Sequence, residues 1–290
     1  MVVVAALGSA LAYALAMMLQ HQSAQQVDST LSLRPGLVVA LLRRRWWLAG
    51  IAANLVAFAL RAFALGHGSL VFVQPLVLSG LVFALALESM ISHRPVSRRE
   101  MLAGATLVAG LAVFLVAASP GRGRTTAAAR SWLVLGAAIT PLIALGLVAA
   151  RRTIGERRAA WLAFAGAFLL AAVAALTKQS AAALSHGLMH ALTDWAPYAL
   201  VVVGGLGVLL TQSAFQAGAL RASLPVLSIV EPLTSIAIGE SVFHERIATS
   251  TPARAAQVIG LVFLMVGVAS LTRSASPVVN PVNESGTMAP

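Results

Sequence analysis

One carboxylate stands out as a residue placed to do chemistry inside an apolar stretch of the chain. Glu231 lies near the middle of Leu220–Phe243, between Pro225 and Pro232. A charge at the centre of a membrane span costs about 2.5–3.5 kcal/mol on insertion scales, so it usually faces a partner or a water-filled path. Each proline removes a backbone N–H, and the freed carbonyl can line a site. Glu231 and Pro232 are therefore candidates for substrate binding or proton coupling; the alternative is a neutral Glu231 hydrogen-bonded between helices.

Three amide side chains also lie within apolar stretches and are candidates for contacts to a substrate. They are Gln74, which directly precedes a proline, and Asn54 and Gln212. Hydrogen bonds between membrane helices account for such residues equally well. The sequence leaves both interpretations open.

Four charged residues form two pairs at matching depths and are candidate gates. Arg61 and Glu240 both lie near the outer ends of their apolar stretches, and Glu88 and Arg221 both lie near the cytoplasmic ends. An ion pair on each side of a central site would close that side. The alternatives are snorkelling of Arg61 to the outer surface and simple solvation of Glu88 and Arg221 at the interface.

Composition defines the class of protein that must position these residues. Of 290 residues, 59% are hydrophobic and 10% are charged, against roughly 25% charged in soluble domains, and the mean hydropathy is +0.88. A soluble enzyme, a nucleic-acid-binding domain and a disordered chain are excluded, because a fold of this size cannot bury so much apolar surface. The net charge of +11 reflects basic loops between apolar stretches rather than a nucleic-acid partner.

No motif indicates catalysis, a cofactor or a metal site. The chain lacks cysteine, so disulfides, thiol nucleophiles and thiolate metal ligands are ruled out. It also lacks a P-loop and any evident nucleophile–base arrangement. His186, His190 and Asp194 are each four apart, but a solvated interfacial segment explains them better than a metal site. We expect a protein that is not an enzyme.

The apolar stretches predict an all-α polytopic membrane protein of about nine spans, since about 20 residues cross the hydrocarbon core. Gly36–Leu42 is too short to span and is expected at the interface. The spans are Val2–Gln20, Trp46–Leu65, Ser69–Ile91, Met101–Ala118, Trp132–Ala150, Ala159–Thr177, Trp195–Phe215, Leu220–Phe243 and Ala253–Leu271.

The distribution of basic residues predicts the orientation. With the N-terminus outside and the C-terminus in the cytoplasm, thirteen of the 20 basic residues are cytoplasmic and six, including the only lysine, Lys178, are outside. This excess fits the positive-inside rule, although the outer loop from Arg122 to Arg130 opposes it. The protein is thus predicted to lie in the plasma (inner) membrane.

Weak internal similarity predicts two repeats in opposite orientation. A shift of 157 residues superposes Leu19, Gln22, Ser23 and Ala24 on Leu176, Gln179, Ser180 and Ala181. A shift of 152 superposes Ala62, Phe63, Gly66, Glu88 and Arg94 on Ala214, Phe215, Gly218, Glu240 and Arg246. The predicted organisation is a first repeat of four spans (1–118), a connector with the fifth span (119–158), a second repeat (159–272) and a disordered tail (273–290). The odd span between the units inverts the second, a pattern of secondary transporters.

Several motifs resemble the drug/metabolite transporter superfamily in its EamA-like branch. SAFQAGAL at 213–220, SLP at 223–225, EPL at 231–233 and GE at 239–240 resemble that branch's second repeat. SLV at 69–71 with QPL at 74–76 resembles its first. The nine-span layout and WWLAG at 46–50 are similar to the NIPA-like branch, which is associated with magnesium transport, although the acidic position that follows in that branch is apolar here, around Val56–Ala57.

This resemblance implies a bundle of two inverted repeats around a cavity that opens to each side in turn. The expected function is a secondary active transporter of a small metabolite, drug or cation. Its expected partners are a small-molecule or ion substrate and the lipid bilayer, with the fifth span as a candidate homodimer contact. The competing hypothesis is a non-transporting membrane partner or scaffold that retains the transporter fold.

Overall fold

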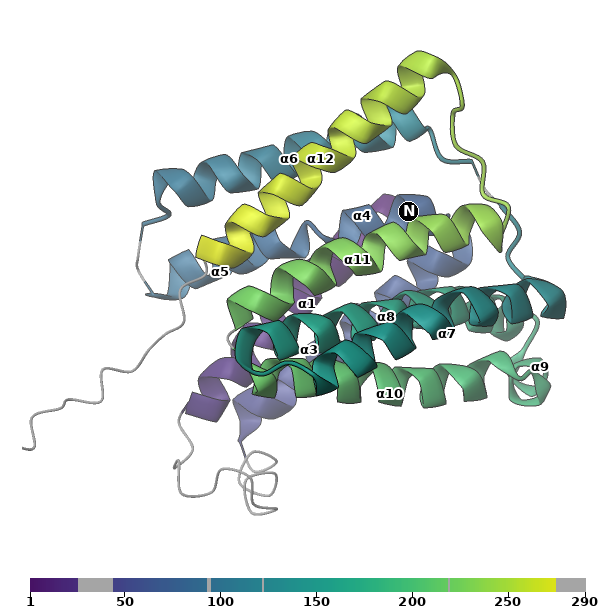
Figure 1. Ribbon diagram of the computed structural model, residues 1–290, viewed down its shortest axis with the longest axis horizontal. Helices are drawn as coiled ribbons and strands as arrows, with labels where there is room; N and C mark the ends of the chain where they lie inside the picture. The colour runs from purple at the N-terminus through teal and green to yellow at the C-terminus, as the bar shows by residue number, and fades with distance from the viewer. Residues whose placement is uncertain (26–43, 93–94, 122, 219, 275–290) are drawn as a thin grey trace, which may run out of the picture.

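The computed structural model describes residues 1–25, 44–92, 95–121, 123–218 and 220–274, and its regular secondary structure is α-helical. Eleven helices and no strand occur in this part of the chain (Figure 1). The segments 26–43 and 275–290 lie outside it, and with them the predicted interfacial stretch and nearly all of the predicted tail. The helices are α1 (Val2–Gln25), α3 (Arg45–His67), α4 (Leu70–Val77), α5 (Gly80–Ser92), α6 (Arg98–Ala118), α7 (Ala129–Arg151), α8 (Gly155–Ser185), α9 (Leu188–Thr193), α10 (Ala196–Ala217), α11 (Leu220–Ser241) and α12 (Thr251–Ser274).

Nine segments of the described chain are long and apolar enough to cross a membrane, which confirms the predicted class and its span count. The prediction was wrong at the sixth span, which runs from Gly155 to Ser185 and not from Ala159 to Thr177. Lys178 therefore lies inside α8 and not in an outer loop. The short helix α9 follows α8 and was not anticipated.

The third span is two helices rather than one. α4 ends at Val77 and α5 begins at Gly80, and the turn between them has short-range bonds, from Leu78 N–H to Pro75 O and from Ser79 N–H to Leu76 O. The proline within α4 weakens helical continuity because it lacks an N–H. Broken helices at membrane depth are tolerated where protein covers the backbone, and here α1 packs against both halves.

Helix α8 is the central element of the bundle. Two thirds of its most apolar window is buried, 67%, against 11% for α10. It packs against α3, α7, α10 and α11. In the other half, α1 packs against α3, α4 and α5. The pair α1–α3 thus packs against the broken helix α4–α5, and the pair α8–α10 packs against α11.

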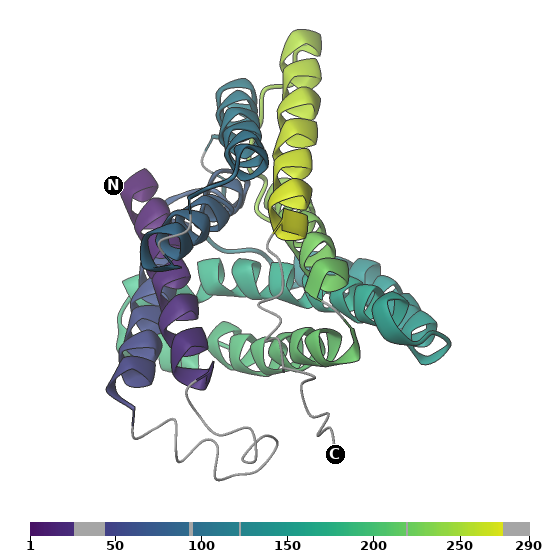
Figure 2. The same cartoon turned by 90° about the vertical axis from the view of Figure 1, so that its left-hand side faces the viewer.

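Helices α6 and α12 form a close pair that stands away from the α8–α10 side (Figure 2). Glycine permits the approach: a Cβ at Gly110 would lie 2.3 Å from Leu264 N, and one at Gly267 would lie 2.5 Å from Leu107 N. α6 begins with a capping box, in which Ser97 and the Glu100 side chain satisfy each other's backbone N–H. Small residues at such a crossing are how membrane helices gain van der Waals contact.

Candidate functional site

Three side chains from three helices form a polar cluster inside the bundle. Arg61 Nη2 donates to Gln74 Oε1 at 2.8 Å and to Glu231 Oε1 at 3.0 Å. The second contact is an ion pair. We call Arg61, Gln74 and Glu231 the central cluster. Its hydrogen bonds are charge-assisted, which makes them about twice as strong as neutral ones.

Helix geometry puts the central cluster at membrane depth. Glu231 is eleven residues from the start of α11 at Leu220 and ten from its end at Ser241, or roughly 15 Å from either end at 1.5 Å per residue. Arg61 lies six residues before the end of α3 at His67, about 9 Å. α4 supplies Gln74, and α4 packs against both α3 and α11.

The central cluster is only partly covered by protein. The Arg61 and Glu231 side chains are 28% and 20% exposed. Tyr13, on α1, lies close enough for both charges to act on its hydroxyl, and its side chain is 49% exposed. The described protein therefore does not enclose the ion pair completely, and α1 lies beside it.

Gln74 carries an unused hydrogen-bond donor. The residue is 2% exposed, and its oxygen accepts from Arg61. Its Nε2 is buried and has no partner among the described residues. Because arginine only donates, the amide must present its oxygen to Arg61, so its NH₂ is the group left over. An unpaired buried donor costs about 1–3 kcal/mol and calls for an explanation.

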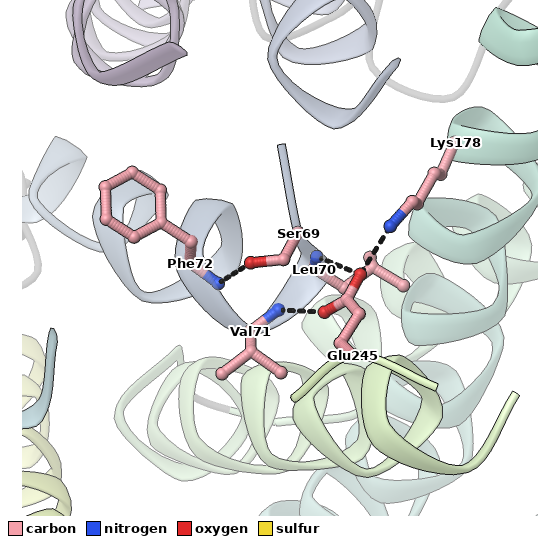
Figure 3. A network of polar contacts seen from close by, with 6 residues as sticks. All are labelled: Ser69, Leu70, Val71, Phe72, Lys178 and Glu245. Carbon is pink, nitrogen blue, oxygen red and sulfur yellow. Dashed lines mark hydrogen bonds and ion pairs between the residues drawn. The ribbon is translucent and has the colours of Figure 1, made fainter. Parts of the chain in front are cut away.

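A second, fully buried ion pair holds the start of α4 (Figure 3). Lys178 on α8 is 2.5 Å from Glu245 Oε1, with side chains 2% and 0% exposed. The same carboxylate accepts from Leu70 N at 2.7 Å and from Val71 N at 2.9 Å. Ser69 Oγ accepts from Phe72 N and completes the cap. We call Lys178, Glu245 and the first turn of α4 the α4 clamp.

Backbone contacts between two loops explain why Glu245 is held there. Glu245 lies in the connection from α11 to α12, and its N–H donates to Gly239 O. The connection from α6 to α7 pairs with it, through Gly121 N to Arg246 O and Arg124 N to Phe243 O. A Cβ at Gly239 would lie 2.5 Å from Glu245 Oε2, so glycine is required for the carboxylate to approach. Phe243 lies under Lys178, 4.8 Å from ring centroid to Nζ.

The predicted outer pair does not form in this structure. Arg61 contacts Glu231 rather than Glu240. Glu240 follows Glu231 by nine positions, which is two and a half helical turns, so their side chains project from opposite faces of α11. Glu240 is exposed. A gating role for Arg61 stays a prediction, and its partner in this state is Glu231.

The other predicted site residues are dispersed. Pro232 is buried beside Glu231, within an α11 that continues through it. Asn54 lies seven residues before Arg61, and so on the same face of α3 two turns away. Gln212 is exposed on α10, and the polar contacts of the central cluster do not include it.

The structure leaves the predicted cytoplasmic pair of Glu88 and Arg221 untested. Glu88 is exposed on α5, and the Arg221 side chain lies outside the described residues.

His186, His190 and Asp194, which are spaced four apart in the sequence, lie around α9. The Asp194 carboxylate accepts from Ala196 N at the start of α10, and the His186 and His190 rings are 5.5 Å apart. Among the described residues, no group of three or more His, Cys, Asp or Glu residues could hold a metal ion.

Sequence reasoning missed Tyr13, Glu245 and the role of Lys178. A signal existed for Lys178: it is the only lysine among 20 basic residues, but its position led us to place it in an outer loop. Glu245 carried no such signal, because it lies in a connection where a charged residue is ordinary. Tyr13 lies in α1 with nothing in its neighbours to mark it.

Comparison with known proteins gives a relative but no function. The chain is 28% identical over 274 residues to an uncharacterized protein of Corynebacterium glutamicum, covering 93% of this chain and 94% of the relative. No family model matches, and no solved structure matches. The similarity thus extends over nearly the whole of both chains.

Proposed function

We propose that this protein is a secondary transporter of the bacterial plasma membrane that moves a small metabolite, drug or cation by alternating access. The observation that carries the proposal is the central cluster, an ion pair at membrane depth that is partly exposed. Charges in such positions are rare and mark substrate or ion pathways. A scaffold has no need to keep two partly open charges there.

The arrangement of helices supports two inverted repeats. α1 with α3 and α4–α5 would be one unit, and α8 with α10 and α11 the other, with α6 and α12 packed together. The broken third span lies beside the ion pair, as discontinuous helices do at transporter binding sites. The motifs that resemble the drug/metabolite transporter superfamily favour the same architecture. The excess of basic residues in the loops assigned to the cytoplasm favours an N-terminus outside.

In this mechanism α4 is the moving part that links the two polar sites. Its first turn is held by the α4 clamp and its middle by Gln74. Opening of the bundle on the side where the α4 clamp lies would require Glu245 to release the α4 backbone. That release would expose the path to the central cluster. The α4 clamp, rather than an ion pair of Arg61 with Glu240, would then close that side of the transporter.

The test is access to the central cluster from both sides of the membrane. The natural chain lacks cysteine, so Tyr13→Cys provides a single reactive site beside the cluster. In proteoliposomes of known orientation, a charged, membrane-impermeant thiol reagent should modify it when added outside and, in a separate sample, when loaded inside. Leu206→Cys, in the middle of α10, is the matched control, because Leu206 is 49% exposed, as Tyr13 is, and it should react from neither side.

Modification from one side only, under every solute tested, would contradict alternating access and favour the non-transporting partner. A flux assay follows, with a pH dye inside the liposomes and a panel of magnesium, amino acids, carboxylates and lipophilic cations. Solute-dependent flux should appear in the wild type and in the control Glu156→Gln, which changes an exposed carboxylate in the first turn of α8. It should be lost in Glu231→Gln.

A further inference from the structure

The polar groups around the ion pair are mostly donors. Arg61 has five N–H groups, and the two hydrogen bonds that it makes in the central cluster both come from Nη2. The Gln74 NH₂ is buried without a partner among the described residues, and Tyr13 adds a hydroxyl. Against these stands one acceptor carboxylate, Glu231. A ligand that satisfies this surplus must bring acceptor oxygens.

We infer that the central cluster binds the carboxylate group of a small organic anion, which displaces Glu231 from Arg61. This inference rests on the proposed transport function and names its substrate class. The two carboxylate oxygens of the anion would form bidentate hydrogen bonds with the Arg61 guanidinium, a geometry that arginine favours. The unpaired Gln74 amide would donate to the same carboxylate.

Charge balance adds a proton to this exchange. In the structure the ion pair sums to zero. When the anion replaces Glu231 on Arg61, an ionised Glu231 would be left uncompensated at membrane depth, which is costly. Glu231 takes up one proton and becomes a neutral carboxylic acid, so the loaded site again sums to zero. One carboxylate anion then moves with one proton, electroneutrally.

The titratable and charged groups on the neighbouring helices bear on the charge balance around Glu231. Arg61 and Tyr13 face Glu231 from α3 and α1, and α4 contributes the uncharged Gln74. α8 brings Lys178, which is engaged by Glu245. α10 brings Tyr198, whose hydroxyl donates to Leu192 O, and α12 brings Arg254 in its first turn.

The test compares carboxylates with their amides on the full-length protein in detergent. The probes are acetate, lactate and succinate, each against acetamide, lactamide and succinamide. At least one carboxylate should raise the melting temperature where its amide does not. In weak buffer with a pH indicator, saturation should draw about one proton per protein from solution.

Glu231→Gln gives the decisive result because it separates this inference from a site in which Glu231 holds the ligand. The variant removes the competitor for Arg61. The dissociation constant for the carboxylate should fall roughly 10- to 100-fold, the size of one hydrogen bond to a charged group, and proton uptake should vanish. Weaker binding in Glu231→Gln would overturn the inference. Arg61→Gln should abolish carboxylate binding.

Failure of the inference and failure of transport have different signatures. If no carboxylate stabilises either the wild type or Glu231→Gln, the inference is wrong, and two-sided modification of Tyr13→Cys still supports a transporter of another solute. If carboxylates bind with proton uptake while Tyr13→Cys reacts from one side only, the site stands and the transport proposal is wrong.

Discussion

Removing the charge of Lys178 should destabilise the protein through the partner that it leaves behind. Lys178→Met keeps an unbranched side chain of similar length over the Phe243 ring, a contact that the thioether sulfur also favours. Glu245 would then be a carboxylate with a fully buried side chain whose remaining donors, among the described residues, are Leu70 N and Val71 N. Breaking a buried ion pair by removing one partner costs about 3–5 kcal/mol.

The opposite single variant should be as damaging, and the double variant much less so. Glu245→Gln leaves Lys178 buried and unpaired, again at about 3–5 kcal/mol. Lys178→Met with Glu245→Gln leaves no charge, and the single glutamine oxygen can still accept from one of the two α4 backbone N–H groups. Because replacing a whole buried pair is often close to neutral, the two changes should couple by ~3 kcal/mol or more.

The assay is thermal unfolding of purified protein in detergent, followed by circular dichroism. At roughly 2–4 °C per kcal/mol, each single variant should lower the melting temperature by about 6–20 °C, and the double variant should recover most of this loss. Glu240→Gln, an exposed carboxylate five residues from Glu245, is the control and should change little. Additive losses in the double variant, or a Lys178→Met melting temperature near that of the wild type, would refute the role given to the clamp.

Three further variants probe how the helices are held, each by the same melting assay. Gly267→Ala should cost about 1–3 kcal/mol by overpacking, since its Cβ would lie 2.5 Å from a backbone nitrogen of α6. The control Gly136→Ala should cost nothing, because its Cβ would have nothing within 4 Å. Equal melting temperatures for the two variants would contradict the close α6–α12 packing. Gln179→Leu should lose about 1–3 kcal/mol, because its oxygen accepts from a backbone N–H and from Trp132 Nε1; an unchanged melting temperature and tryptophan spectrum would argue against that bond. Ser97→Ala should cost about 1 kcal/mol through loss of the α6 cap, and a stability equal to wild type would show the cap to be dispensable.

The span count followed from the sequence because hydropathy records a requirement of the membrane itself. Every spanning helix needs a long apolar stretch, and the nine stretches predicted correspond to the nine found. Helix ends were harder to predict, because α8 continues to Ser185 past a charged residue. A single lysine reads as the edge of a span unless its partner is known, and that partner lies 67 residues away in the chain.

The break in the third span was harder to predict for a related reason. Proline is common in membrane helices, and α11 continues through both Pro225 and Pro232, whereas the third span breaks after Pro75. The difference lies outside the local sequence. The Glu245 carboxylate caps α4 at its first turn, and α1 and α11 pack against its sides, so tertiary contacts support a helix of eight residues.

Depth along a span was predicted better than direction around it. Glu231 was expected near the middle of its helix and is found there, because 1.5 Å per residue converts position into depth. Arg61 and Glu240 were paired by depth alone, and that reasoning ignored rotation. Nine residues on one helix turn a side chain to the opposite face, so the glutamate that Arg61 meets in this structure is Glu231. Predicting which residues pair across membrane helices requires both their depth along the helix and their direction around its axis. Hydropathy gives only the depth.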